Sequence, residues 1–406
     1  MGEDNARTDG DEAVRIGIVG AGNRGRNHAL RYARIPGAEV VAVADVDEAK
    51  ARNLADSHGA ESYASHAEML ADADLGLDAV NLCVHAPLHA PIGVDALEAG
   101  TDVFCEKPMA DSYAAARRLS EAAERTGQRL AVQNQLLYTV ETRAAKAVAD
   151  AGELGEVYHG VAGRSRGWAF DVENTEVAMG ARRRGTPYVD GYGSPAFARE
   201  ESAGGGAVYD LGSYTIGQIL YLMGSPTVER VRGETFRTTP ARARAAEDDE
   251  YRRRVEQSGY DVEDVGVGLV TFEDGSVLSV RASWSRYQED ESSAVVGTRG
   301  GVRLDPFEYY STVGDVEMRA SADLEEFRFR QQYLDGERGE MAYRSGLAAD
   351  PLYHWVEGLA GRTDPLPTAE LGLEAMLAMD GIYRSAGLGR EVTREEVVED
   401  ADPTPE

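Results

Sequence analysis

A short apolar segment that runs directly into a glycine-rich turn constrains this chain more than any other feature. Residues 14–19 form a β-branched run typical of a buried parallel strand. The turn follows as Gly20-Ala21-Gly22-Asn23-Arg24-Gly25, and residues 27–33 continue as a helix. Glycines so placed allow a tight turn, close approach to a pyrophosphate and close helix–strand contact, while the helix N-terminus offers N–H groups to phosphate. The pattern predicts a dinucleotide-binding turn.

An acidic residue at the end of the next strand fits the same interpretation. The apolar run 40–44 ends at Asp45, twenty residues beyond Gly25. A carboxylate there can accept hydrogen bonds from ribose hydroxyls and repels a 2′-phosphate, which favours NAD over NADP. Arg24 in the turn can soften that repulsion, so NADP remains possible. The alternative is a glycine-rich turn without a ligand, and the order of strand, glycines, helix, strand and acid favours the dinucleotide.

Strands and helices alternate through the first third of the chain. Three further strands and two helices are expected at 79–84, 102–105 and 130–132, and at 90–99 and 111–126. Alternation of this kind predicts an α/β fold with a doubly wound parallel sheet. We assign residues 13–135 to this dinucleotide-binding Rossmann domain.

The pattern changes to longer, half-polar strands in the rest of the chain. Strands are expected at 156–167, 227–238, 265–272 and 276–284, and helices at 136–151, 206–223, 351–361 and 370–387. Glu273-Asp274-Gly275 predicts a hairpin, so residues 136–395 form an α+β domain with a mainly antiparallel sheet. The segments 168–203 and 239–262 are charged and irregular, and such segments often cover a site. The acidic ends, 1–12 and 396–406, are expected to be disordered tails.

Two clusters carry candidate chemistry. Lys107 follows the strand 102–105 directly, where side chains face the ligand crevice of a doubly wound sheet. It is one of only three lysines among 42 basic residues, and an ammonium, unlike a guanidinium, can lose its proton when buried. Asp210 and Tyr214 lie four residues apart on a predicted helix, so a proton acceptor and a donor share a face. The alternatives are a solvated lysine, a helix cap and a core tyrosine.

Together these clusters resemble the Gfo/Idh/MocA family, which includes glucose–fructose oxidoreductase and inositol 2-dehydrogenase. The resemblance covers the glycine turn, the segment from Asp78 through Pro87 and His89, Glu106-Lys107-Pro108, and Asp210-x-Gly212. It implies an N-terminal Rossmann domain, an open-faced C-terminal sheet and a nicotinamide cofactor. The implied reaction is hydride transfer between NAD(P) and a hydroxyl-bearing carbon of a sugar, cyclitol or related polyol.

The resemblance also implies roles for individual residues. Lys107 is expected to bind substrate and assist proton transfer, Asp210 to orient a substrate hydroxyl, and Tyr214 to stand where the family usually has histidine. The residues expected at the cofactor are Gly20, Gly22, Asn23, Arg24, Gly25, Asp45, Pro87, His89, Glu106 and Lys107. For His89, packing at a helix start is an equally good explanation.

Other functions and candidate residues are also open. Some relatives oxidise a sugar transiently with tightly held NAD and cleave a glycosidic bond, and a non-catalytic dinucleotide sensor is a third class. No cysteine–histidine spacing suggests a metal site. The weaker candidate site residues are His85, Trp168, Tyr188, the run Arg182-Arg183-Arg184, and the trio Asp350, His354 and Glu357.

Charge and cysteine content limit the partners and the environment. With 71 acidic and 42 basic residues the net charge is −29, which disfavours nucleic acid and anionic membranes as partners and is typical of halophile proteins that work in molar salt. Cys83 and Cys105 are expected to be buried, reduced thiols. We found no apolar segment typical of a signal peptide or membrane span, so we expect a cytoplasmic protein. The family resemblance implies subunit contacts through the sheet of the second domain, so we expect a homodimer or homotetramer. Edge strands and an apolar sheet face would otherwise be exposed.

Overall fold

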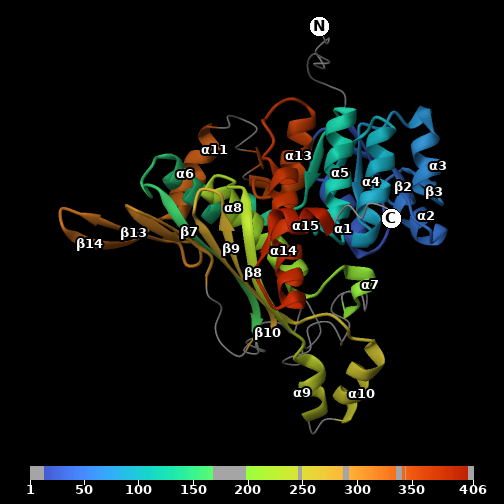
Figure 1. Ribbon diagram of the computed structural model, residues 1–406. Coiled ribbons are helices and arrows are strands. Elements are labelled where there is room, and N and C mark those ends of the chain that lie inside the picture. Colours follow the sequence, from blue (N-terminus) through green and yellow to red (C-terminus); the bar gives the residue numbers. More distant parts are fainter. Residues whose placement is uncertain are drawn as a thin grey trace. The chain divides into compact units, whose positions relative to one another are not determined.

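The computed structural model describes residues 13–167, 198–245, 249–286, 292–334, 341–342 and 344–400. The chain divides into two compact units (Figure 1). Unit 1 comprises Met1–Met109, Ala116–Tyr138 and Arg328–Glu370, and unit 2 comprises Ala110–Ala115, Thr139–Phe327 and Leu371–Glu406. The chain therefore crosses from one unit to the other several times.

Unit 1 is built on a parallel six-stranded sheet with the strand order β3-β2-β1-β4-β5-β6. Its strands are β1 (Val14–Val19), β2 (Ala38–Ala44), β3 (Glu61–Tyr63), β4 (Ala79–Leu82), β5 (Asp102–Cys105) and β6 (Leu130–Val132). Its helices include α1 (Asn23–Tyr32), α2 (Glu48–Asp56), α3 (His66–Ala71), α4 (His89–Glu98), most of α5 (Tyr113–Thr126) and α13 (Pro351–Leu359). Short 3-10 turns span Ala73–Leu75, Ala86–Leu88 and Gln135–Tyr138. The predicted doubly wound parallel sheet is confirmed.

The core of unit 1 includes a segment far away in the sequence. Ile16 and Ile18 of β1 belong to one buried cluster with Phe104 of β5 and with Leu352 and Trp355 of α13. Unit 1 therefore contains residues 328–370, which the sequence analysis placed in the second domain. Periodicity shows that such a helix has an apolar face but not which sheet it covers.

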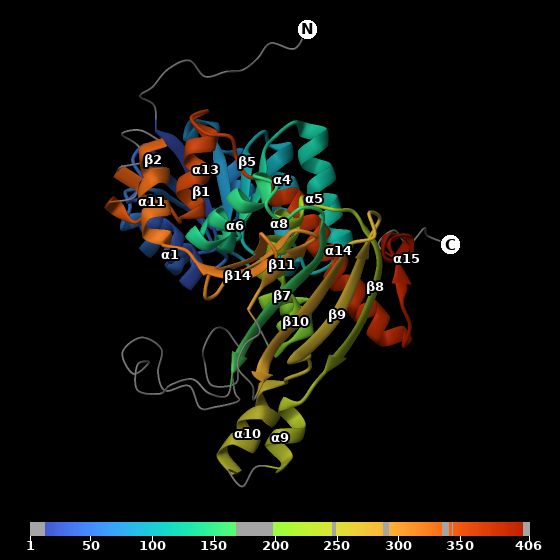
Figure 2. The same ribbon diagram turned by 90° about the vertical axis from the view of Figure 1, so that its left-hand side faces the viewer.

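Unit 2 contains a nine-stranded sheet in the order β14-β13-β12-β11-β7-β10-β9-β8-β15. The strands are β7 (Val157–Gly167), β8 (Val228–Phe236), β9 (Val265–Phe272), β10 (Val277–Arg286), β11 (Ala294–Gly297), β12 (Gly300–Arg303), β13 (Glu308–Val313), β14 (Val316–Ser321) and β15 (Val392–Thr393). Figure 2 shows β7, β10, β9 and β8 side by side. Among the strands of this sheet that the structure describes, only β7 and β10 pair in parallel, so the mainly antiparallel sheet and its hairpin at 273–275 are confirmed.

Helices pack on one face of this sheet. The helices with residues in unit 2 are α6 (Val140–Asp150), α7 (Glu200–Ala203), α8 (Ser213–Met223), α9 (Thr239–Ala245), α10 (Asp249–Ser258), α15 (Arg394–Asp400) and parts of α11 (Leu324–Leu334) and α14 (Thr368–Leu388). Gly160 of β7 lies against Ile219 of α8, and Gly268 of β9 against Ile382 of α14. Since side chains alternate along a strand, Val267 and Leu269 point to the opposite face, where they are 37% and 45% exposed.

Three predictions about the second part of the chain need correction. Residues 239–262 are not irregular, because they contain α9 and α10. The N–H of Thr239 at the start of α9 donates to Asp264, a carboxylate from outside the helix that local sequence does not reveal. Residues 396–400 are not a tail, because Val397 of α15 is buried. The helix expected over 206–223 begins with a π-helical turn, Val208–Gly212.

Two further expectations concern thiols and membranes. Cys83 and Cys105 are free and buried, as predicted. None of the helices in the part of the chain that the structure describes is both long and apolar enough to cross a membrane.

Candidate active site

The glycine turn of unit 1 has the geometry that its sequence predicts. Gly20 has a φ of +100°, and a Cβ there would lie 2.4 Å from the carbonyl oxygen of Cys83. A Cβ on Gly25 would lie 1.8 Å from the carbonyl oxygen of Gly20. A Cβ on Gly22, by contrast, would meet no described atom within 4 Å. Two glycines are therefore needed to close the turn, and the third leaves open space beside it.

The open space adjoins the N-terminus of α1. Among the described residues no side chain caps this helix, and its first turn contains no acidic residue. Its first N–H groups can therefore bind an anion. At the end of β2 the Asp45 carboxylate accepts the N–H of Ala21 (2.7 Å) and the N–H of Asp47 (2.8 Å). These residues fit a dinucleotide: α1 and the turn would hold the pyrophosphate, and Asp45 lies at the position expected for the ribose.

The Glu106-Lys107-Pro108 segment rests on a buried polar network. Glu106 Oε1 lies 2.9 Å from His28 Nε2, and Glu106 Oε2 accepts the N–H of Lys107 (3.2 Å). Asn81 Nδ2 donates to Tyr32 Oη (3.0 Å) and lies 2.9 Å from His28 Nδ1. Burial alone would raise the pKa of Glu106, but the close contact with His28 and the charges of Arg24 and Lys107 lower it to about 2. Glu106 is therefore a buried, ionised carboxylate, and the neighbouring Lys107 is half-buried.

His89 joins the two loops that follow β4 and β5. It is 1% exposed, with Nδ1 2.9 Å from the carbonyl oxygen of Pro108 and Nε2 3.1 Å from that of Val84. Pro87 lies in the 3-10 turn just before α4. This geometry supports packing at the helix start, the alternative considered for His89, and its contact with a cofactor remains a prediction.

In unit 2, Asp210 lies in the π-helical turn and Tyr214 in the first turn of α8. The α-helical spacing that we assumed for this pair does not apply across the π turn, a feature frequent at functional sites. Trp284 of β10 donates from Nε1 to Asp210 Oδ2 (2.9 Å), and the guanidinium carbon of Arg164 of β7 lies 4.9 Å from the centroid of the Tyr214 ring. Both side chains are 6% exposed and face the paired strands β7 and β10.

Two acid–phenol pairs lie at this turn and at the glycine segment that precedes it. Glu263 accepts the N–H groups of Gly206 (2.8 Å) and Val208 (2.9 Å) and the hydroxyl of Tyr383 (2.8 Å). The hydroxyl of Tyr209 donates to Asp380. Sequence reasoning missed these groups because Glu263 lies more than fifty residues from the backbone that it binds, and no local pattern marks it.

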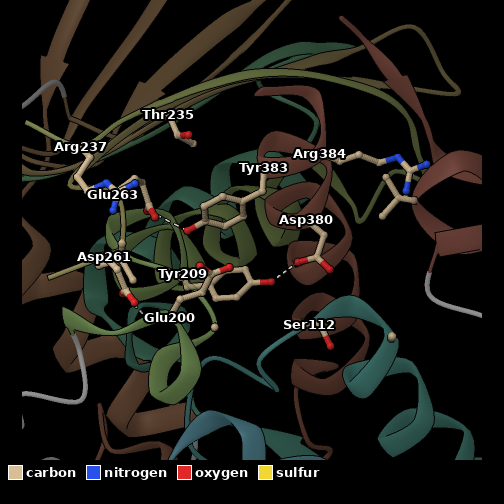
Figure 3. A pocket seen from close by; sticks show the side chains of 15 residues that line it. Ser112, Glu200, Tyr209, Thr235, Arg237, Asp261, Glu263, Asp380, Tyr383 and Arg384 are labelled. Atoms are coloured by element: carbon tan, nitrogen blue, oxygen red, sulfur yellow. Dashed lines mark hydrogen bonds between the residues drawn. The ribbon is translucent and has the colours of Figure 1, made fainter. Parts of the chain in front are cut away.

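The two pairs lie in the wall of a cavity of about 640 Å³ in unit 2 (Figure 3). Charged side chains from several elements line it, among them Glu200, Arg237, Asp261 and Arg384. Burial raises the pKa of Asp380 to about 6, and burial also raises the pKa of Glu263 although hydrogen bonds from Val208, Tyr383 and Gly206 oppose the effect. The cavity was not anticipated from the sequence, because its lining comes from dispersed segments.

The weaker candidates have structural partners or lie outside the described residues. Asp350 caps α13 and pairs with Arg31. The ring of His354 stacks on Tyr138, and buried Glu357 pairs with Arg362. His85 is exposed. Trp168, Tyr188 and the run Arg182-Arg183-Arg184 lie outside the described residues. Within the described part of the chain, no group of three or more potential ligands could hold a metal ion.

Two known domain families match consecutive parts of this chain. Residues 14–134 match the Gfo/Idh/MocA oxidoreductase family with its NAD-binding Rossmann fold, and residues 142–303 match a Gfo/Idh/MocA C-terminal domain. D-glucoside 3-dehydrogenase of Escherichia coli (strain K12) is 28% identical over 302 residues, covering 73% of this chain and 79% of that protein. Inositol 2-dehydrogenase 3 of Saccharopolyspora erythraea is 39% identical over 144 residues, covering 35% of this chain and 42% of that protein.

Solved structures share the fold over almost the whole chain. GenD2 from gentamicin A biosynthesis, in complex with NAD, has a TM-score of 0.66 at 24% identity and covers 95% of this chain and 97% of its own. An oxidoreductase domain protein from Kribbella flavida has a TM-score of 0.70 at 18% identity, covering 94% and 99%. Because the family's two domains match in order over most of the chain, this protein is a member of the Gfo/Idh/MocA family of NAD-binding oxidoreductases.

Proposed function

We propose that this enzyme transfers a hydride between NAD and a hydroxyl-bearing carbon of a sugar, cyclitol or related polyol. The observation that carries the proposal is the similarity to D-glucoside 3-dehydrogenase over 73% of the chain. The inositol 2-dehydrogenases that match the N-terminal part support the same substrate class. NAD supplies the hydride acceptor when bound, and the turn at Gly20–Gly25 with Asp45 would hold it.

Lys107 and Tyr214 are the proposed proton-transfer pair, and Asp210 the group that orients the substrate hydroxyl. Oxidation of a secondary alcohol requires a base for the hydroxyl proton and accurate positioning of the reacting carbon. In support, Lys107 is half-buried, and its backbone N–H donates to the ionised Glu106. The indole of Trp284 donates to the Asp210 carboxylate and so fixes its position. The assignment of three residues to one reaction rests on the family resemblance.

The substitution Lys107→Ala tests the assignment. Turnover should fall by about 10²–10⁴-fold because a positioned acid–base group is lost, while NAD affinity changes little. Stopped-flow turnover and NAD titration of the purified variant measure the two effects, and Lys146→Ala, at another of the three lysines, is the matched control. Near-normal turnover of Lys107→Ala would remove the proposed role.

A panel of sugars, sugar acids and cyclitols in molar KCl distinguishes the alternatives. Net NADH formation on free polyols supports the dehydrogenase. Glycoside cleavage without net NADH would indicate the transient-oxidation mechanism, and NAD binding without any turnover would indicate a sensor. The names of the relatives favour the dehydrogenase.

We also infer a homodimer or homotetramer. Supporting this, Leu269 and Val267 lie exposed on the sheet face opposite α8 and α14, and exposed apolar groups on a sheet are typical of interfaces. Leu269→Glu should lower the molar mass measured by light scattering if this face is the interface, whereas Leu388→Glu, at an exposed leucine of a helix, should not. An unchanged mass for Leu269→Glu would exclude this face.

A cytoplasmic location is proposed from the two unpaired, buried thiols, since a reducing compartment keeps cysteines in this state. Thiol alkylation after denaturation of freshly extracted protein should modify both cysteines. Recovery of an oxidised form would count against the location.

A further inference from the structure

We propose that His28 is a positioning residue for the reaction assigned above: its buried contact with Glu106 fixes the segment that carries Lys107 relative to helix α1. The inference rests on the proposed role of Lys107. His28 is 0% and Glu106 5% exposed, and the atoms in contact, Nε2 and Oε1, are 2.9 Å apart. In sequence the two residues are far apart, and no motif marks His28.

The neighbours of His28 determine which nitrogen carries its hydrogen. Asn81 Nδ2 has two hydrogens, one directed to Tyr32 Oη at 3.0 Å and the other to His28 Nδ1 at 2.9 Å. Nδ1 is therefore the acceptor, and in the neutral ring the hydrogen lies on Nε2, which faces Glu106. Asn81 lies in β4, so the sheet itself orients the imidazole.

The contact is transmitted to Lys107 through the second oxygen of the same carboxylate. Glu106 Oε2 accepts the backbone N–H of Lys107 at 3.2 Å. His28 belongs to α1, whose N-terminus adjoins the glycine turn. One carboxylate thus links the helix that starts at the turn to the backbone of Lys107. A displacement of about 1 Å in such an arrangement can cost about 10²-fold in rate.

A purely structural role does not explain why the buried Glu106 next to His28 is ionised. A buried carboxylate is a poor source of stability, because desolvation offsets the attraction that its neighbours provide. The charged and titratable groups around Glu106 are His28, Arg24 and Lys107, with the thiols of Cys83 and Cys105. Burial raises the pKa of both thiols well above the usual value, so they remain neutral and His28 is the fully buried side chain in contact with the carboxylate.

The first test compares three variants. His28→Leu should lower kcat about 10²-fold with little change in NAD affinity, because Lys107 is displaced while the glycine turn is intact. His28→Gln, which retains a donor toward Glu106, should recover part of the loss. His66→Leu is the matched control: His66 Nε2 also lies 2.9 Å from a carboxylate, Asp95, but at the surface, and kcat should not change.

The second test needs no turnover and therefore applies even if the proposed substrate class is wrong. Without the His28 donor, Glu106 should take up a proton near pH 7 and give the infrared band of a neutral carboxyl in the NAD-free protein. The band should be absent from wild type and from the double variant His28→Leu with Glu106→Gln.

Either of two results would overturn the inference: wild-type kcat in His28→Leu, or no neutral-carboxyl band in that variant at pH 7. If His28→Leu does not fold, as judged by circular dichroism, Asn81→Leu tests the same contact because it removes the donor that fixes Nδ1 as acceptor. It should also lower kcat, and wild-type kcat there would contradict the proposal. Loss of activity in Lys107→Ala without any effect in His28→Leu would separate the two hypotheses.

Discussion

At the scale of single residues, Asp45 has a structural and a proposed binding role. Its two oxygens hold Ala21 of the glycine turn and Asp47, at 2.7 and 2.8 Å. A carboxylate has about four lone-pair sites, so acceptor capacity remains for ribose hydroxyls. Its negative charge, and not only its shape, should select NAD over NADP.

Asp45→Asn keeps an acceptor oxygen and removes the charge. We expect the NADP-to-NAD ratio of kcat/KM to rise about tenfold or more, which corresponds to about 1.4 kcal/mol. Steady-state kinetics with both cofactors measure the ratio. Asp47→Asn, which neutralises a neighbouring acid, should leave it unchanged. An unaltered ratio in Asp45→Asn, or a wild-type preference for NADP, would contradict this role.

At the scale of elements, the π-helical turn before α8 is held by groups from other parts of unit 2. Glu263 binds the backbone of Gly206 and Val208, and Asp380 of α14 binds the hydroxyl of Tyr209 and the N–H of Tyr113. The turn is therefore held by carboxylates that lie far from it in the sequence. Figure 3 shows both acid–phenol pairs at the cavity.

Asp380 gives this region a predictable response to pH. Burial raises its pKa from 3.8 to about 6, so between about pH 4 and pH 6 the unfolded chain has lost a proton that the folded protein retains. Folding stability from this group must then fall as the pH rises through that window. The variant Asp380→Asn has no titrating group at this position. The difference between its unfolding free energy and that of wild type should therefore rise from pH 4 to pH 6.5. Urea unfolding measures the difference, with Asp56→Asn, at an exposed acid of α2, as control. A constant difference would refute the shift.

At the scale of the whole molecule, a net charge of −29 on 406 residues makes self-repulsion the dominant long-range term. At about 1 M salt the Debye length is about 3 Å, so the repulsion between surface carboxylates is screened. We predict that the unfolding free energy and the activity both rise from dilute buffer to molar KCl. Molar NaCl, which screens charge to the same extent, should reproduce the effect. Full stability in dilute buffer would exclude halophilic adaptation.

Local patterns were sufficient for much of unit 1. The strands 14–19 and 102–105 and the turn at Gly20–Gly25 were predicted within a residue or two, because alternation, β-branching and glycine sterics act over short distances. The strand Glu61–Tyr63 was missed, since three polar residues carry no apolar period. The helices α9 and α10 were missed because their many charged residues were interpreted as an irregular segment.

The sequence alone determined the two kinds of sheet, the dinucleotide turn and the family, since each depends on residue types at fixed short spacing. Only the tertiary structure decided that α13 completes the core of unit 1, that Glu263 holds the turn before Asp210, and that His28 lies against Glu106. Those contacts join residues dozens to hundreds of positions apart. Their formation depends on how elements pack, and packing is set by the whole fold and not by any local segment.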